Sequence, residues 1–177
     1  MPDRKPRLLN SRELWEYALR VLAGRAVSTA EMREKLRRRA ELAGDVDAAL
    51  ARLKDYGYLN DRSFAEGFAA ARLSNEKLGS ARVLRDLRRR RVAPALAETT
   101  VRQAYHGVDE QALIEDWIRR KYRLAEREGL FQEDKDLAKA YARLLRAGFR
   151  SAEIVTTLKR FARNPELLDS FEPPEEE

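Results

Sequence analysis

Basic side chains grouped in three short clusters carry the clearest chemical signal in this sequence. The clusters are Arg37-Arg38-Arg39, Arg88-Arg89-Arg90-Arg91 and Arg119-Arg120-Lys121. Guanidinium and ammonium groups bind phosphate oxygens and acidic surfaces, and contacts of this kind position a partner without reading nucleic-acid bases. These residue types predict contact with a polyanion, while a solvated surface with charge pairing inside each helix is the plainer explanation.

Helical spacing arranges some of these cations in rows. Consecutive helical residues fan out by about 100°, so no cluster lies wholly on one face. Arg82, Arg85 and Arg89 recur at i, i+3 and i+7, and Arg33 and Arg37 form a shorter row. We predict nine contact candidates for phosphate or for an acidic groove: Arg33, Arg37, Arg82, Arg85, Arg88, Arg89, Arg119, Arg120 and Lys121.

The charge of the chain is distributed unevenly. Its 36 basic and 30 acidic residues give a net charge of +6, but six of the acids lie between residues 164 and 177, where no base occurs. The remainder carries a net charge of +12 and is attracted to polyanions. The acidic end either only aids solubility or shields the basic rows until a partner displaces it.

The composition also limits the class of protein and its compartment. No run approaches the roughly 18 apolar residues of a membrane span, and no apolar segment of signal-peptide length follows the N-terminal residues. Cysteine is absent, which excludes disulfides and thiolate metal sites and fits a reducing compartment. We expect a soluble, cytoplasmic protein that acts as a monomer.

Residues suited to catalysis are not grouped anywhere in the sequence. The single histidine, His106, precedes Gly107 at an expected helix end, where a structural role is the usual one. No glycine-rich phosphate loop with its lysine occurs, and carboxylates mostly alternate with arginines at helical spacing, as in Glu34 and Arg38. We therefore predict no enzyme, no catalytic residue, no metal and no cofactor, so any effect on ATP turnover would act through a partner.

The helical spacing of apolar residues predicts an all-α fold of about nine helices, and no alternating strand pattern occurs. A capping box from Ser28 starts the second helix, and Ser151 is the expected cap of the ninth. On the fourth helix, the expected core residues are Phe64, Phe68, Ala71 and Leu73. The expected helices cover about 11–23, 29 onward, 44 onward, 61–76, 80 onward, 94 onward, 109–127, 133–147 and 151 onward.

The nine helices fall into three groups of three. Placing Leu36 over Leu87, and Leu87 over Leu144, gives spacings of 51 and 57 residues. This pattern predicts an elongated, curved array of three tandem three-helix repeats, a shape that presents long surfaces to large partners. The expected segments are a flexible N-terminal arm at 1–10, repeats at 11–59, 60–107 and 108–163, and an acidic disordered tail at 164–177.

A short hinge joins the first repeat to the second. Gly57 can adopt the left-handed conformation that ends a helix. Either Asn60 or Asp61 can cap the helix that follows, because a short polar side chain accepts hydrogen bonds from the free N–H groups. The side chains expected to seal this joint are Tyr58, Leu59 and Phe64.

Several linked motifs resemble the RecX family of recombinase regulators over residues 11–162. The hinge from Gly57 to Ala65 resembles that family's "GYLDD-x-x-FA", with Asn60 at the first aspartate. Upstream, Ser28-x-x-Glu31-Met32-x-x-Lys35-Leu36 is similar to "S-x-x-E-L-x-x-K-L". Downstream, Leu78-Gly79-x-x-x-Val83-x-x-x-Leu87 is similar to "G-x-x-x-I-x-x-E-L", and Arg146-Ala147-Gly148-Phe149 resembles the third-repeat "R-G-F".

The sequence departs from the family pattern at a few turns. Family members usually have a glycine four residues after the motif leucine of each repeat. Ala40 and Arg91 occupy those places in the first two repeats, and only Gly148 keeps the glycine. Asp86 stands where the second repeat usually has glutamate.

The resemblance implies three helical repeats in a cytoplasmic bacterial protein that binds the RecA recombinase. Family members lie in the groove of the RecA filament on single-stranded DNA, limit its growth or promote its loss, and so reduce ATP hydrolysis, strand exchange and cleavage of the SOS repressor. Direct DNA binding would be weak. The alternative is a stand-alone basic helical protein that binds DNA or RNA and needs no recombinase, which the composition fits equally well.

Overall fold

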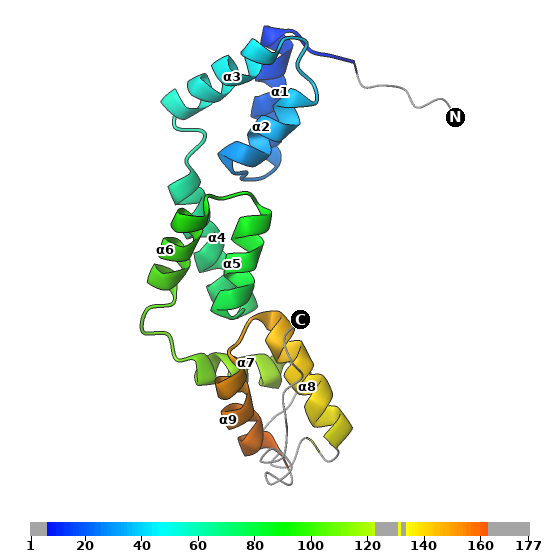
Figure 1. Cartoon of the computed structure of the whole chain (residues 1–177), viewed down its shortest axis with the longest axis vertical. Coiled ribbons are helices and arrows are strands. Elements are labelled where there is room, and N and C mark those ends of the chain that lie inside the picture. Colours follow the sequence, from blue (N-terminus) through cyan, green and yellow to red (C-terminus); the bar gives the residue numbers. More distant parts are fainter. Residues whose placement is uncertain (1–6, 123–130, 132–133, 163–177) are drawn as a thin grey trace, which may run out of the picture. The chain divides into compact units, whose positions relative to one another are not determined.

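The structure, a computed structural model, describes residues 7–122, 131 and 134–162, and this part of the chain is all α-helical (Figure 1). The predicted fold class is thereby confirmed for the described residues, which contain isolated bridges but no strand. The helices are α1 (Ser11–Gly24), α2 (Thr29–Arg37), α3 (Ala43–Asp55), α4 (Asp61–Glu76), α5 (Ser80–Arg89), α6 (Pro94–Ala104), α7 (Glu110–Tyr122), α8 (Asp134–Ala147) and α9 (Ser151–Phe161).

Two helices begin with a capping box. The Ser28 hydroxyl accepts a hydrogen bond from Glu31 N at 3.1 Å, and the Glu31 carboxylate accepts one from Ser28 N at 3.2 Å, as the sequence predicts. Asn10 and Glu13 cap α1 in the same reciprocal way. Each box satisfies two N–H groups that a helix start otherwise leaves without a partner.

The predicted cap of α9 is wrong by one residue. The cap position is Arg150, and its side chain makes no capping hydrogen bond. Ser151 is instead the first helical residue, and its hydroxyl lies 2.9 Å from the Tyr141 hydroxyl in a hydrogen bond. The serine therefore ties α9 to α8.

The buried stripe of α4 is rotated by one residue from the predicted one. Ala65 and Ala69 are fully buried, whereas Phe64 and Phe68 are only half-buried and Ala71 is exposed. Both pairs are four residues apart, so both fit one helical face. The small alanines take the inner positions, and the two phenylalanine rings lie at the edge of the stripe.

The described chain divides into two compact units that alternate along the sequence. Unit 1 holds the described residues up to Phe68 together with Asp86–Thr100, and unit 2 holds Ala69–Arg85 together with the described residues from Val101 on. This division cuts through the expected second repeat at 60–107, so the three repeat boundaries stay a prediction.

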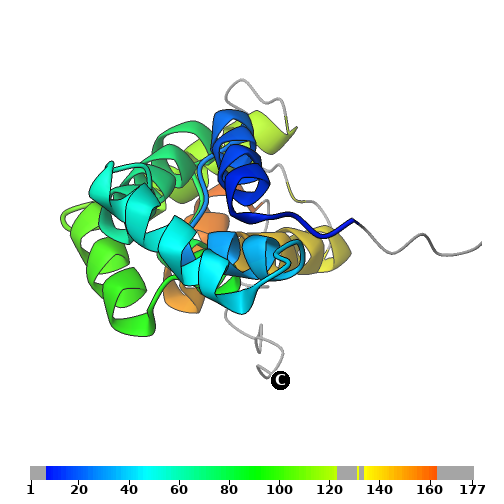
Figure 2. The same ribbon diagram turned by 90° about the horizontal axis from the view of Figure 1, so that it is seen from above.

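In unit 1, α1, α2 and α3 lie against one another around a single core (Figures 1 and 2). Its fully buried side chains include Leu14, Met32, Leu36 and Leu53. Leu9 also belongs to this core, and its backbone N–H donates to the Arg39 carbonyl at 2.7 Å. The end of the expected arm at 1–10 is therefore part of the fold, in contrast to the prediction, because Leu9 supplies apolar surface and Asn10 caps α1.

In unit 2, α7, α8 and α9 surround a second core (Figure 1). Ile114, Ile118, Leu144 and Leu158 are fully buried there. Phe131 is buried against the same core and pairs with Ala162. The predicted end of the seventh helix at 127 and the acidic tail at 164–177 lie outside the described residues.

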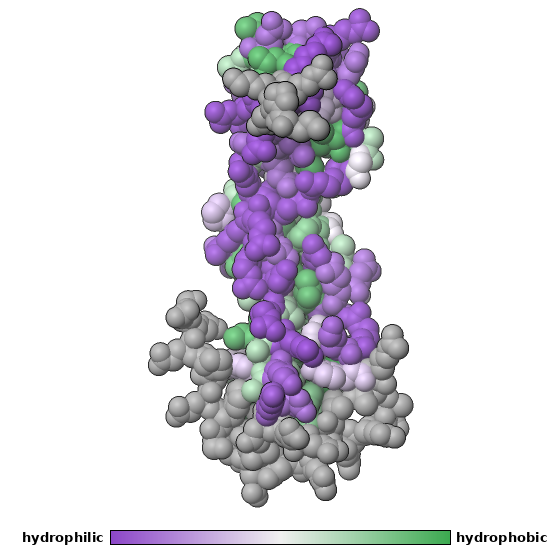
Figure 3. Space-filling model, turned by 90° about the vertical axis from the view of Figure 1, so that its right-hand side faces the viewer, coloured by the Kyte–Doolittle hydropathy of each residue, from purple (hydrophilic) through white to green (hydrophobic). Residues whose placement is uncertain are grey.

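Hydrophilic residues cover much of the described surface on the face shown in Figure 3. Among the helices of the described part, none is both long and apolar enough to cross a bilayer. No group of three or more metal-ligating side chains occurs among the same residues.

Candidate functional site

The turn after α3 needs a glycine. Gly57 has φ +72°, a left-handed conformation that disfavours residues with a Cβ. The N–H groups of Tyr58 and Leu59 then both donate to the Leu53 carbonyl, at 2.8 and 3.2 Å. This closure returns Leu59, which is only 5% exposed, to the core of unit 1.

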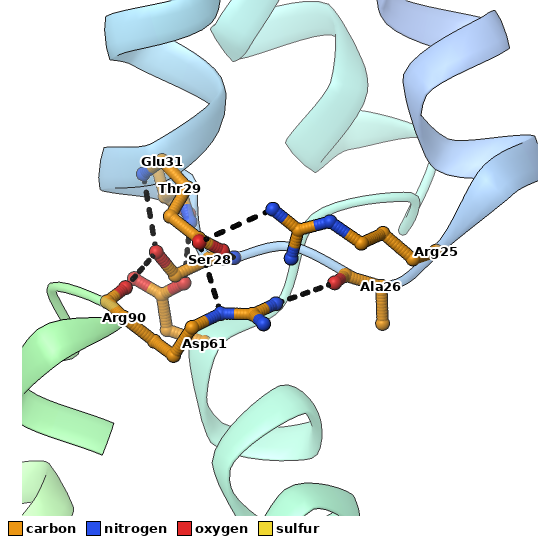
Figure 4. Close-up of polar contacts among 7 residues, drawn as sticks. All are labelled: Arg25, Ala26, Ser28, Thr29, Glu31, Asp61 and Arg90. Carbon is orange, nitrogen blue, oxygen red and sulfur yellow. Dashed lines mark hydrogen bonds and ion pairs between the residues drawn. The ribbon is translucent and has the colours of Figure 1, made fainter. Parts of the chain in front are cut away.

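The two polar residues of the hinge have different roles. The Asn60 side chain accepts a hydrogen bond from Ser63 N at 3.0 Å, so Asn60 is the cap of α4. The Asp61 carboxylate accepts from Thr29 N at 2.7 Å, in the first turn of α2 (Figure 4). A carboxylate is favourable there because the N-terminal end of a helix carries partial positive charge. Asp61 thus joins α4 to α2.

Ser28 and Arg90 hold the start of α2 against the end of α5 (Figure 4). The Ser28 hydroxyl donates to the Arg90 carbonyl at 2.6 Å. The Arg90 guanidinium donates to the Ala26 carbonyl at 2.9 Å and forms an ion pair with Glu31 at 2.9 Å. It also lies 5.3 Å from the centre of the Phe64 ring. Arg90 is not among the nine contact residues predicted from the sequence, because nothing in a run of four arginines shows which one turns inward.

Tyr58 does not seal the joint as predicted. Its side chain is 55% exposed, while Leu59 is buried and Phe64 is half-buried beneath Arg90. The hydroxyl of a tyrosine is costly to bury without a partner, and this ring has remained at the surface.

Unit 2 contains a contact of the same kind at equivalent positions. Gly79 N, at the start of α5, donates to the Ala147 carbonyl at the end of α8, at 2.9 Å. Gly79 lies 51 residues after Ser28, and Ala147 lies 57 residues after Arg90. These are the spacings of the predicted repeat. A serine side chain makes the contact in unit 1, and bare backbone makes it in unit 2.

Glycine is required on both sides of the backbone contact in unit 2. A Cβ built on Gly79 would overlap the Gly148 carbonyl, and a Cβ built on Gly148 would overlap the backbone of Arg82. Gly148 also has φ +92°. The two chain segments can approach this closely only because neither residue has a side chain.

Three of the nine predicted contact residues cap helix ends in unit 2. Arg82 and Arg85 both donate to the Arg146 carbonyl near the end of α8, at 3.4 and 3.3 Å. Arg120 donates to the Glu76 carbonyl at the end of α4, at 3.1 Å. Cations are favourable at these ends because the last carbonyls carry partial negative charge. These arginines therefore have a structural role whatever else they contact.

Three more of the predicted residues are already paired with carboxylates at the surface. Their partners reduce the charge that remains for an outside ligand. The pairs are Arg33 with Asp47 at 2.5 Å, Arg88 with Glu98 at 2.8 Å and Arg119 with Glu115 at 3.7 Å.

The last three of the predicted residues are exposed cations: Arg37, Arg89 and Lys121. Within the described ranges, their side chains form no hydrogen bond or ion pair. Arg37 and Arg89 lie in unit 1, near the ends of α2 and α5, and Lys121 lies in unit 2 near the end of α7. A phosphate or carboxylate can approach these groups without first displacing an internal partner.

Tyr105 is the one side chain in this part of the chain with a strongly raised pKa. Its hydroxyl donates to the Leu78 carbonyl at 2.6 Å. Burial, with a smaller effect from the Glu110 carboxylate, raises the pKa of Tyr105 to about 12. The neighbouring His106 is exposed. Tyr105 therefore stays a neutral hydrogen-bond donor at physiological pH.

Comparison with known proteins gives a consistent result. The family model described as "RecX, second three-helix domain" matches residues 60–101. The "Regulatory protein RecX" of Deinococcus radiodurans is 33% identical over 180 residues, a match that covers 98% of this chain and 79% of that protein. The protein of the same name from Trichlorobacter lovleyi is 32% identical over 134 residues, which covers 76% of this chain and 86% of that protein.

A solved structure supports the fold. The crystal structure of RecX from Lactobacillus salivarius has a TM-score of 0.63 with this chain, at 19% sequence identity, and the alignment covers 85% of this chain and 96% of that one. The predicted family is thus confirmed by relatives that are 32–33% identical over 76–98% of this chain. With hinge, helix caps and relatives in agreement, the chain belongs to the RecX family.

Proposed function

We propose that this chain is a non-enzymatic regulator of the RecA recombinase. It binds RecA and the groove of the RecA filament on single-stranded DNA, and it limits the growth or the stability of that filament. The consequence is lower ATPase, strand-exchange and co-protease activity, and hence less homologous recombination and a weaker SOS response. Membership of the RecX family, whose named relatives are regulatory proteins, is the observation that carries the proposal.

The exposed cations supply the chemistry for such binding. The side chains of Arg37, Arg89 and Lys121 are exposed and form no hydrogen bond or ion pair within the described chain, so they are available to phosphates or to an acidic groove. The net charge of +12 before residue 164 attracts such a partner over longer distances. Binding that depends on these groups weakens as salt is added. The protein acts as a monomer in the cytoplasm, where RecA is found.

A second function is compatible with the same cations. A stand-alone helical protein that binds DNA or RNA would use them on phosphates and would need no recombinase. Its effect on RecA would then be indirect, through competition for the nucleic acid.

ATP hydrolysis by RecA on single-stranded DNA distinguishes the two functions. Added before RecA, the protein should block filament growth, and added to formed filaments it should lower hydrolysis as filaments shorten. Inhibition should occur at a ratio of about one protein to many RecA subunits, which competition for DNA cannot explain. Unchanged hydrolysis at micromolar protein, or inhibition only when the DNA itself is saturated, would contradict regulation of RecA.

A further inference from the structure

Four side chains of unit 1 form a surface that the basic rows do not include. We name Trp15, Arg52, Tyr56 and Tyr58 the aromatic–arginine surface. The ring centres of Trp15 and Tyr56 are 6.0 Å apart, and those of Tyr56 and Tyr58 are 5.9 Å apart. The Arg52 guanidinium lies 4.1 Å from the centre of the Trp15 ring and 5.5 Å from that of Tyr56. The neighbouring rings are tilted by 52° and 32° to one another, so the three rings and the cation form one continuous cluster at the surface, which we call the stack.

This surface is exposed, although aromatic rings consist mostly of apolar atoms, which are usually buried. Tyr56 is 59% exposed and Tyr58 is 55% exposed. Trp15 is half-buried because one side of it packs on the core of unit 1. Arg52 has no carboxylate partner among the described residues. Large aromatic side chains left at the surface beside an unpaired arginine are typical of a binding surface, where one face is apolar and the other polar.

A groove beside the stack extends it between α1 and α3. The groove has a volume of about 450 Å³ and is lined by Ser11, Arg12, Trp15, Ala48, Ala49 and Arg52. Two of its six lining residues are arginines and none is acidic. One of these arginines, Arg12, is paired with the Glu16 carboxylate at 3.2 Å, which reduces the charge that it leaves for a ligand. The groove thus offers one unpaired cation, Arg52, next to aromatic faces.

We propose that the aromatic–arginine surface binds single-stranded DNA by stacking unpaired bases. Aromatic rings and guanidinium planes both stack on base faces, which duplex DNA conceals and single strands expose. Tyr56 and Tyr58 present their exposed rings to the bases, and the Arg52 guanidinium, which lies over the Trp15 ring, supplies the cation for the neighbouring phosphates. The choice of DNA over RNA rests on the proposed function, while the stacking itself rests on the geometry alone.

The fluorescence of Trp15 provides a direct test, in the full chain and without any recombinase. Trp117→Phe removes the second tryptophan, which lies in unit 2, so that emission reports Trp15 only. A thymidine oligonucleotide should quench this emission, whereas polyphosphate and duplex DNA at equal charge should not. In the same background, Tyr56→Ala with Tyr58→Ala should weaken binding of the oligonucleotide at least tenfold. Leu42→Ala, which removes another exposed side chain of unit 1, should leave it unchanged.

Each other outcome overturns the inference. Absence of quenching means that no base reaches the stack, and equal quenching by polyphosphate means that charge alone accounts for binding. If the double tyrosine variant binds the oligonucleotide normally but no longer inhibits RecA, the surface serves a protein partner instead. Because the fluorescence test contains no RecA, its failure leaves the proposed function standing, and a failure of RecA regulation leaves the stacking result intact.

Discussion

The Ser28 hydroxyl donates a hydrogen bond to the Arg90 carbonyl at 2.6 Å, across 62 residues of sequence. The same oxygen accepts a hydrogen bond from Glu31 N and so caps α2. One fully buried hydroxyl therefore both starts a helix and fixes that helix against the end of α5.

Replacement of Ser28 by alanine should lower the free energy of unfolding by about 2 kcal/mol, since it removes a helix cap and leaves the Arg90 carbonyl without its partner. Urea unfolding followed by circular dichroism measures this change. Ser28→Thr keeps the hydroxyl and should recover about half of the loss. Ser11→Ala, at an exposed position that caps nothing, should change stability by less than about 0.5 kcal/mol. A loss no larger than that of the Ser11 variant would show that the contact to Arg90 contributes nothing.

Two left-handed glycines should tolerate alanine very differently. At Gly57, with φ +72° and no atom near the added Cβ, alanine should cost only the conformational strain of about 1 kcal/mol. At Gly148, the Cβ would also overlap the backbone of Arg82, so alanine should cost at least about 2 kcal/mol more or prevent folding. Urea denaturation of both variants measures the difference. If both variants lose the same free energy of unfolding, the chain segments around Gly79 and Gly148 can move apart without loss of stability.

Tyr105 should make stability depend on alkaline pH. In the unfolded chain this phenol ionises near its ordinary pKa of about 10, whereas in the folded protein its pKa is about 12. Its contribution is therefore fully present below about pH 10 and is lost as the pH rises toward 12. Tyr105→Phe should cost about 1 kcal/mol at pH 7, where it loses the bond to Leu78. That difference should shrink and then reverse between pH 10 and 12, as urea unfolding across this range would reveal, and a constant difference would contradict the shift.

The exposed cations should matter more for RecA than other arginines of equal charge. Arg37→Glu with Arg89→Glu should raise the concentration needed to inhibit RecA strand exchange by about tenfold or more, because like charges would then face the acidic partner. Arg20→Glu with Arg62→Glu changes the net charge equally, at exposed positions outside the rows, and should have a much smaller effect. Arg85 is less suitable for this test, since its guanidinium also caps the end of α8. If the two double variants change the inhibitory concentration equally, Arg37 and Arg89 do not contact RecA or its filament.

Local signals in the sequence predicted much of this structure. The capping box of Ser28 and the left-handed turn at Gly57 depend on residues within a few positions, and both are present as expected. The choice between Asn60 and Asp61 stayed open because it depends on Thr29, 32 residues away, which binds Asp61 and leaves the cap to Asn60. Contacts at this distance leave no pattern in a single sequence.

The rows of basic residues also show that contacts between distant residues cannot be predicted from a single sequence. Periodicity places Arg82, Arg85 and Arg89 on one face, but it cannot indicate that Arg82 and Arg85 turn toward the end of α8 while Arg89 stays unpaired. Arg52 was not among the contact residues predicted from the sequence, for a related reason. Its spacing of four residues from Tyr56 was visible in the sequence, but its partner Trp15 lies on another helix.

Arg91 has the left-handed backbone conformation that is usual for glycine. It stands where the family usually has glycine, and it has φ +58°, the conformation that glycine adopts at little cost. Its guanidinium donates to the Glu34 carboxylate at 3.5 Å. At the corresponding place in the first repeat, the N–H of Ala40 still donates to the Leu36 carbonyl at 2.8 Å. The loss of the family's glycine at both places did not predict that Arg91 would have a positive φ or that Ala40 would form this hydrogen bond.

The alternation of the two units along the chain has a consequence during protein synthesis. A nascent chain that ends at Phe68 lacks the segment Asp86–Thr100, which completes unit 1. The contacts between Asp86–Thr100 and the earlier part of unit 1 can therefore form only after Thr100 has left the ribosome, when Ala69–Arg85 has been synthesised but its partners from Val101 onward have not. Translation adds about 5–20 residues per second, so this interval lasts seconds. During it, the contacts that Ala69–Arg85 makes with the later part of unit 2 are not yet possible.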